Sequence, residues 1–175
     1  MDEPTLYLNP VEIPKDRLSE FQEFFEDLNK ETDRGAALST TAFIDSLLER
    51  LLTAFLIPNK SARELISEAN SPLGTFSARI RACHAIGLIS DTEFKECTIL
   101  RKIRNEFAHK VKMSFDDDRV KGLCSGISQL GEWPDGQPVV ARLKFHLSAI
   151  AIIMNLTNRP RQAEELALKY KPWKR

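Results

Sequence analysis

Residues 91–112 read DTEFKECTILRKIRNEFAHKVK, and this stretch decides the fold class. Its apolar residues recur every three or four positions, which places them on one face of an α-helix. They are Phe94, Cys97, Leu100, Ile103 and Phe107. Ser90 and Glu93 form a capping box at the start, because the hydroxyl and the carboxylate can each satisfy a free helix amide. The pattern therefore predicts a long helix with one buried face.

Helical periodicity extends over almost the whole chain. We expect further helices at about residues 18–28, 38–55, 61–70, 75–86, 116–131 and 139–156, followed by a last short helix. Gly35 and Pro160 interrupt the pattern and predict breaks, and Gly87 predicts the end of a helix. No stretch alternates apolar and polar residues as a strand does. The predicted fold class is all-α, a single-domain helical bundle of about seven to eight helices with a long central helix pair.

The chain divides into three parts. Residues 1–13 contain two prolines and predict an extended N-terminal arm. Residues 14–157 form the helical domain, and residues 158–175 form a short C-terminal helix and a basic tail. Ser61 and Glu64 match a second capping box, which predicts the start of one short helix at Ser61.

The overall charge limits the classes of protein to which the chain can belong. The 25 basic residues are balanced by 25 acidic ones, in a chain of 175 residues that is 42% hydrophobic. This balance excludes a disordered polyelectrolyte and argues against a strongly basic coat for nucleic acid. A local basic cleft remains open.

The cysteines and the apolar runs point to a cytoplasmic protein. Cys83, Cys97 and Cys124 are an odd number at wide spacings, which indicates buried reduced thiols rather than disulfides or a zinc site. The N-terminus has no apolar run typical of a signal peptide. The longest apolar stretch, Leu147 to Leu156, is far shorter than the roughly 20 residues of a membrane span, so we expect no membrane contact.

Motifs of nucleotide and metal chemistry are absent from the sequence. There is no phosphate-binding glycine loop, no dinucleotide fingerprint and no HExxH pair. We therefore expect neither a metal nor a cofactor.

The segment RKIRNEFAHK, residues 101–110, carries the candidate catalytic site. Arg101, Asn105 and His109 recur every four residues and share a helix face. An arginine suits a phosphate, and a histidine can move a proton near neutral pH. Arg104, Asn105 and His109 together could promote attack of an RNA 2′-hydroxyl on the neighbouring phosphate without a metal.

The angle between two of these residues limits the hypothesis. Arg104 and His109 are about 140° apart on a straight helix of 3.6 residues per turn. One phosphate would meet both side chains only if two protomers pack these faces together, or if the helix frays before His109. The competing interpretation is structural, because a histidine near a helix end also interacts favourably with the helix dipole.

Basic residues around this segment predict a groove for the RNA backbone. They are Arg79, Arg81, Arg101, Lys102, Lys110 and Lys112. A solvated charged face is the competing interpretation.

The spacing Arg104-Asn105-x-x-x-His109, near the end of a long helix in an all-α domain, resembles the R-N-x-x-x-H signature of the HEPN superfamily. That superfamily includes metal-independent endoribonucleases of toxin–antitoxin, defence and RNA-processing systems. The resemblance implies that Arg104 stabilises the transition-state charge, that Asn105 positions the phosphate and that His109 transfers the proton. It also implies a homodimer in which both protomers complete the cleft.

A second resemblance covers about residues 36–157. SPLGTFSARI, residues 71–80, and AIGLI, residues 85–89, are similar to the mannitol operon repressor (MltR) family. In that family a Gly-Pro-Leu-Gly-Asp-Leu-Ser-x-Arg-Leu segment leads to a Gly-Leu-Gly-x-Ile turn and a long helix, whereas Ser71 and Thr75 replace the first glycine and the aspartate here. The family pattern is degenerate where this chain has its complete R-N-x-x-x-H set, which favours the ribonuclease interpretation.

Three functions follow from these patterns. The first is a HEPN-type endoribonuclease that acts as a homodimer on RNA and is restrained by an antitoxin or another regulatory protein. The second is a non-catalytic transcriptional regulator of the MltR type, acting through a protein partner or through DNA. For DNA, the helices at 61–70 and 75–86 would form a helix-turn-helix that presents Arg79, Arg81 and His84. The third is an interaction module whose Arg-Asn-His face is a dimer contact.

Overall fold

The computed structural model describes residues 28, 30–68, 70–110, 112–128 and 140–171, and the structural statements below concern these residues. They form six helices and no strand, which confirms the all-α fold class. The helices are α2 (Asp33–Phe55), α3 (Lys60–Ile66), α4 (Phe76–Ala85), α5 (Asp91–His109), α6 (Asp118–Ser125) and α7 (Ala141–Glu165). The arm expected at 1–13 and almost all of the helix expected at 18–28 lie outside the described residues.

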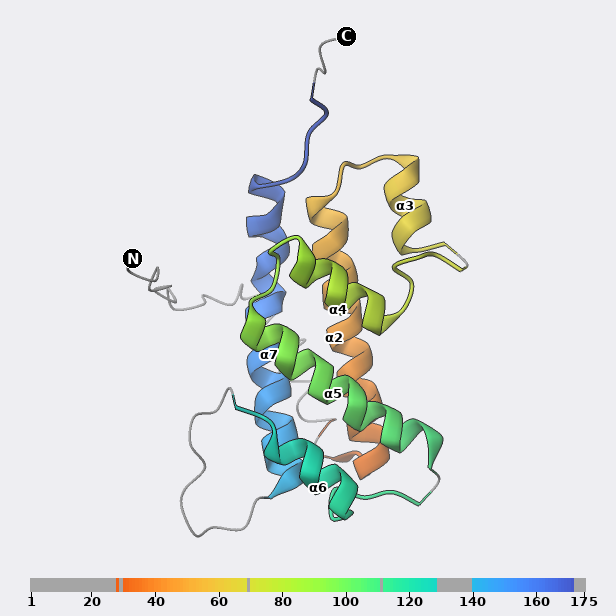
Figure 1. Ribbon diagram of the computed structural model, residues 1–175, viewed down its shortest axis with the longest axis vertical. Coiled ribbons are helices and arrows are strands. Elements are labelled where there is room, and N and C mark those ends of the chain that lie inside the picture. Colours follow the sequence, from red (N-terminus) through yellow and green to blue (C-terminus); the bar gives the residue numbers. More distant parts are fainter. Residues whose placement is uncertain (1–27, 29, 69, 111, 129–139, 172–175) are drawn as a thin grey trace, which may run out of the picture.

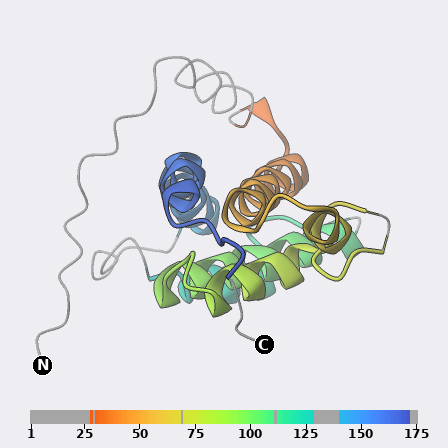
Figure 2. The same cartoon turned by 90° about the horizontal axis from the view of Figure 1, so that it is seen from above.

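The helices form two layers. α2 and α7 lie side by side, and α4 and α5 cross them on one side (Figures 1 and 2). α3 lies beside α2, and α6 contacts α5 and α7. The core fills the space between the layers with apolar side chains, mainly from α2, α5 and α7. Their burial provides the main favourable contribution to folding.

The helix α5 is fixed at both ends. At its start the Ser90 hydroxyl accepts from the Glu93 amide and the Glu93 carboxylate accepts from the Ser90 amide, which confirms the predicted capping box. At its end the Arg34 guanidinium donates to the carbonyls of Ala108 and Lys110, at 3.4 and 3.2 Å. These bonds satisfy groups that a helix end leaves free, and α5 therefore holds its side chains in fixed directions.

A buried ion pair joins the start of α5 to α7. The Glu93 carboxylate lies 2.7 Å from the Arg159 guanidinium, and Glu93 is 5% exposed. Burial alone would raise the pKa of Glu93, but the hydrogen bond and charge of Arg159, with further bonds from Ser90, outweigh it and hold that pKa below its usual value. Glu93 is therefore ionised and paired near neutral pH.

The turn from α4 into α5 follows the prediction at Gly87. This glycine has φ +76°, in the left-handed region that disfavours residues with a Cβ. Its amide donates to the His84 carbonyl, and the Leu88 amide donates to the Cys83 carbonyl. The two bonds form a Schellman motif that ends α4 and lets α5 pack beside it.

Three predicted helix ends are wrong. Gly35 lies inside the first turn of α2, where its amide donates to the Thr32 side chain, so it does not break the chain. α3 begins after Asn59, whose side chain caps the helix, and not at the Ser61 capping box. Gly126 ends α6 earlier than the expected end near residue 131. In each case a neighbouring polar side chain or turn, rather than apolar periodicity, sets the boundary.

The predicted break at Pro160 is also wrong. Pro160 lies inside α7, which continues to Glu165 and includes the residues expected to form a separate last helix. A proline inside a helix removes one amide donor and costs about 3 kcal/mol in isolation. Leu156 and Ala163, on either side of it, are buried, so packing of α7 on the bundle offsets that cost.

The cysteines match their predicted role. Cys83, Cys97 and Cys124 are free and buried. Burial raises the pKa of the Cys83 and Cys124 thiols to about 12 and raises that of Cys97 as well. All three thiols are therefore protonated near neutral pH and act as apolar packing groups.

Two further properties concern the described residues alone. None of their helices has the length and apolar character needed to cross a bilayer. They also contain no group of three or more histidine, cysteine, aspartate or glutamate side chains placed to hold a metal ion.

Candidate functional site

The predicted catalytic residues lie on the C-terminal half of α5. Ile103 and Phe107 face the core, as the sequence predicts, while Arg104 and His109 are exposed and Asn105 is half-buried. The Arg104 guanidinium donates to the Asn105 side-chain oxygen at 3.3 Å. The three polar side chains are therefore accessible to a ligand or to another protein.

The geometry of α5 excludes one of the two ways to bring Arg104 and His109 together. The helix is continuous through His109, so it does not fray before this residue. Five positions along a continuous helix turn the two side chains about 140° apart. One copy of the chain therefore does not direct both groups at a single phosphate.

A carboxylate inside the candidate site was missed by the sequence analysis. Glu106 lies 2.9 Å from Lys110 and 3.2 Å from Arg119 of α6. The hydrogen bonds from Lys110 and Arg119 hold the pKa of Glu106 below its usual value. Lys110 is thus paired within the protein, which reduces its availability for RNA. The i,i+4 spacing of Glu106 and Lys110 is the signal that could have revealed this pair.

An unpaired basic surface does exist on α4 and α5. We call it the basic face: Arg81 and Arg101 line one pocket, and Lys102 and Arg104 lie on either side of Arg101 around α5. Within the described part of the chain, no carboxylate forms an ion pair with any of them. Lys112 is exposed and lies beyond the end of α5.

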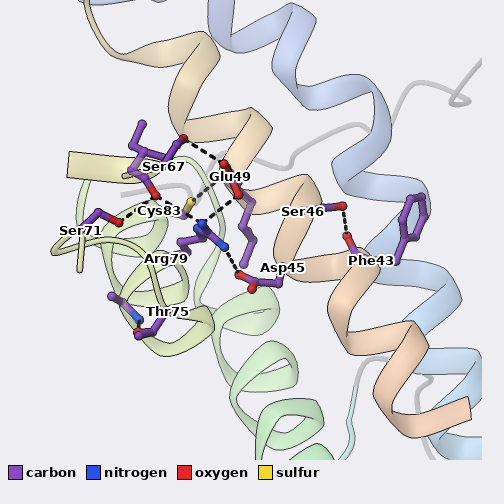
Figure 3. A network of polar contacts seen from close by, with 12 residues as sticks. Phe43, Asp45, Ser46, Glu49, Ser67, Ser71, Thr75, Arg79 and Cys83 are labelled. Atoms are coloured by element: carbon purple, nitrogen blue, oxygen red, sulfur yellow. Dashed lines mark hydrogen bonds and ion pairs between the residues drawn. The ribbon is translucent and has the colours of Figure 1, made fainter. Parts of the chain in front are cut away.

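Arg79 does not join the basic face. It is 8% exposed and points toward α2, where its guanidinium lies 2.9 Å from Asp45 and 2.8 Å from Glu49 (Figure 3). It also donates to the Ile66 carbonyl at the end of α3. Ser67 donates to Glu49 and completes this network. The predicted phosphate ligand is therefore a structural cross-link between α2, α3 and α4.

The helix-turn-helix interpretation retains only Arg81 of its three predicted contact residues. Arg79 is buried as described, and His84 lies 2.7 Å from Asp91 and stacks on Phe94 at a ring distance of 4.2 Å. α3 has seven residues and α4 has ten. This geometry gives little side-chain surface for reading bases in a DNA groove.

No protein-family model matches the chain, and no curated protein matches it. Among solved structures, the chain is similar to one in the X-ray structure of the MtlR-HPr complex from Escherichia coli, with a TM-score of 0.52. The match covers 84% of this chain and 98% of that chain. At 19% sequence identity, this likeness establishes that the two chains share a fold.

Proposed function

We propose that this chain is a non-catalytic regulator of the mannitol operon repressor type, which acts by binding a protein partner. The observation that carries the proposal is the basic face on α4 and α5, where four basic side chains have no acidic partner among the described residues. The fold likeness supports it, because MtlR was solved in a complex with HPr.

Electrostatics gives the basic face a physical role. The chain has no net charge, and several of its carboxylates form ion pairs at other places in the structure. Asp45 and Glu49 hold Arg79, Glu93 holds Arg159, and Asp33 holds Arg142. Because none of the described carboxylates pairs with the basic face, it is a local positive patch on a neutral protein, and such a patch speeds association with an acidic surface and orients it. α5 presents it rigidly, since both helix ends are capped.

The test is a binding measurement between the full chain and purified HPr by isothermal titration calorimetry. We expect saturable binding that weakens as salt is raised. The double substitution Lys102→Glu and Arg104→Glu should weaken binding at least about 10-fold, because two attractive charges become repulsive. Arg63→Glu, an exposed arginine of α3 away from this face, is the matched control and should bind like the unmodified chain.

Two results would contradict the proposal. One is the absence of any binding to HPr by the folded chain. The other is equal binding by the basic-face variant and the Arg63→Glu control, because the partner would then use a different surface.

A second candidate function is a metal-independent endoribonuclease, favoured by the exposure of Arg104 and His109 on one helix. A 2′-hydroxyl would attack the neighbouring phosphorus and pass its proton to an imidazole, while the bond to the 5′-oxygen breaks and that oxygen takes up a proton. A guanidinium would stabilise the charge of the transition state. Because the two side chains diverge on one copy, this function requires a homodimer that joins Arg104 of one copy with His109 of the other.

Incubation of the chain with single-stranded RNA in EDTA tests this second candidate. We expect products that end in a 2′,3′-cyclic phosphate, and at least a 100-fold loss of rate in His109→Ala, the usual scale for removal of an acid–base group. His84→Ala is the matched control, because His84 is a partly exposed histidine engaged by Asp91 on another helix. Equal cleavage by the His109→Ala and unmodified chains would identify the activity as a contaminant.

A further inference from the structure

A small pocket lies between α4 and α5 at the edge of the basic face. Its volume is about 90 Å³, and it is lined by Ser77, Ile80 and Arg81 of α4 and by Phe94, Thr98 and Arg101 of α5. One water needs roughly 10–15 Å³ of such space, so the pocket accepts several waters or one small tetrahedral ion. None of the lining residues is acidic.

Arg101 stands apart from the other arginines of the described chain. Each of the other partly or fully buried arginines has acceptors within the protein: Asp45 and Glu49 for Arg79, backbone carbonyls for Arg34, and carboxylates for Arg142 and Arg159 of α7. Arg101 is also half-buried, but no ion pair or hydrogen bond to it occurs among the described residues. Its guanidinium lines the pocket and keeps its donors available for an anion that enters there.

The two hydroxyls that line the pocket also lack a hydrogen-bond partner within the described residues, unlike hydroxyls elsewhere in the helices. Thr41, Thr53 and Thr157 of the other helices donate to the carbonyl four residues before them. Ser77 and Thr98 make no such bond in the described structure, although both are half-buried. Two guanidiniums and two hydroxyls, all with free donors, thus line one small cavity.

We infer that this pocket binds a phosphate monoester or inorganic phosphate, held by Arg81 and Arg101 and by the hydroxyls of Ser77 and Thr98. Two guanidiniums match the double negative charge of such a group, and their planar forks suit its oxygens. The apolar side chains of Ile80 and Phe94 lower the local dielectric constant and strengthen the attraction. Arg81 and Arg101 also belong to the basic face, but the docking test substitutes only Lys102 and Arg104, so failure of the docking proposal and failure of this inference are distinguishable.

The experiment is a titration of the isotope-labelled full chain, followed by the amide resonances of Ser77 and Thr98. The ligands are sodium phosphate, methyl phosphate and dimethyl phosphate, each at the same ionic strength. We expect saturable shifts with phosphate and methyl phosphate, and at least about 10-fold weaker binding of dimethyl phosphate, which carries a single charge. Binding of methyl phosphate would identify an esterified group as ligand, whereas binding of phosphate alone would identify the free ion.

Substitutions locate the binding. Arg101→Gln should weaken phosphate binding at least about 10-fold, and Arg101→Lys should weaken it less, because a lysine keeps the charge and loses the fork. Arg63→Gln, an exposed arginine of α3, should bind like the unmodified chain. An unchanged thermal unfolding curve shows that each variant is folded. Equal affinity of Arg101→Gln and the control, or equal binding of methyl and dimethyl phosphate, would overturn the inference.

Discussion

Replacement of Glu96 by alanine is expected to lower the free energy of unfolding by roughly 2–4 kcal/mol. Glu96 is 0% exposed and connects three elements. Its side chain accepts from the Ser128 amide at 2.8 Å and from the Ser148 hydroxyl at 2.7 Å. Ser128 follows α6 and Ser148 belongs to α7, so loss of the carboxylate leaves donors of both elements without an acceptor and opens a cavity.

Glu96→Gln is the matched control for this prediction. A glutamine keeps one oxygen to accept from Ser128 and gains an NH₂ group that can donate to the Ser148 oxygen. We expect it to lose less than half as much stability as Glu96→Ala in urea unfolding. If the two variants are equally stable, the hydrogen bonds of Glu96 contribute nothing beyond filling space.

The features predicted correctly from sequence are local ones. The capping box of Ser90 and Glu93 and the helix end at Gly87 depend only on residues within a few positions, so a short window contains all the chemistry that sets them. The apolar periodicity of residues 91–112 likewise predicts which side chains of α5 are buried. The breaks predicted at Gly35 and Pro160 were wrong. The Thr32 cap overrides the tendency of Gly35 to break a helix, and tertiary packing of α7 overrides that of Pro160.

In the candidate site, too, the features set by nearby residues were predictable and those set by distant residues were not. The exposure of Arg104 and His109 follows from the position of Ile103 and Phe107 on the buried face. The burial of Arg79 depends on Asp45, a residue 34 positions away, which no local pattern contains. One signal was nevertheless available. Arg79 lies four residues before Cys83, which the sequence already places in the core, so both share one face of α4.

Replacement of Phe107 by alanine is expected to cost about 3–5 kcal/mol of unfolding free energy, the largest effect that we predict. Phe107 is 0% exposed, and its ring lies 4.9 Å from that of Phe115, which in turn lies 5.2 Å from Phe145 of α7. The three rings therefore connect α5, the segment before α6 and α7. Truncation at Phe107 removes one end of this chain and leaves a cavity that the well-packed surroundings fill only in part.

His109→Ala is the matched comparison for Phe107→Ala, because His109 lies only two positions further along α5 but is exposed. An exposed residue without a buried contact should change stability by no more than about 0.5 kcal/mol. A loss at His109 as large as that at Phe107, measured by urea unfolding, would make the histidine part of the scaffold. Stability with loss of activity would instead assign it to chemistry. The resemblance to R-N-x-x-x-H spans both kinds of residue, so only this pair of measurements separates the residues that build α5 from those that it displays.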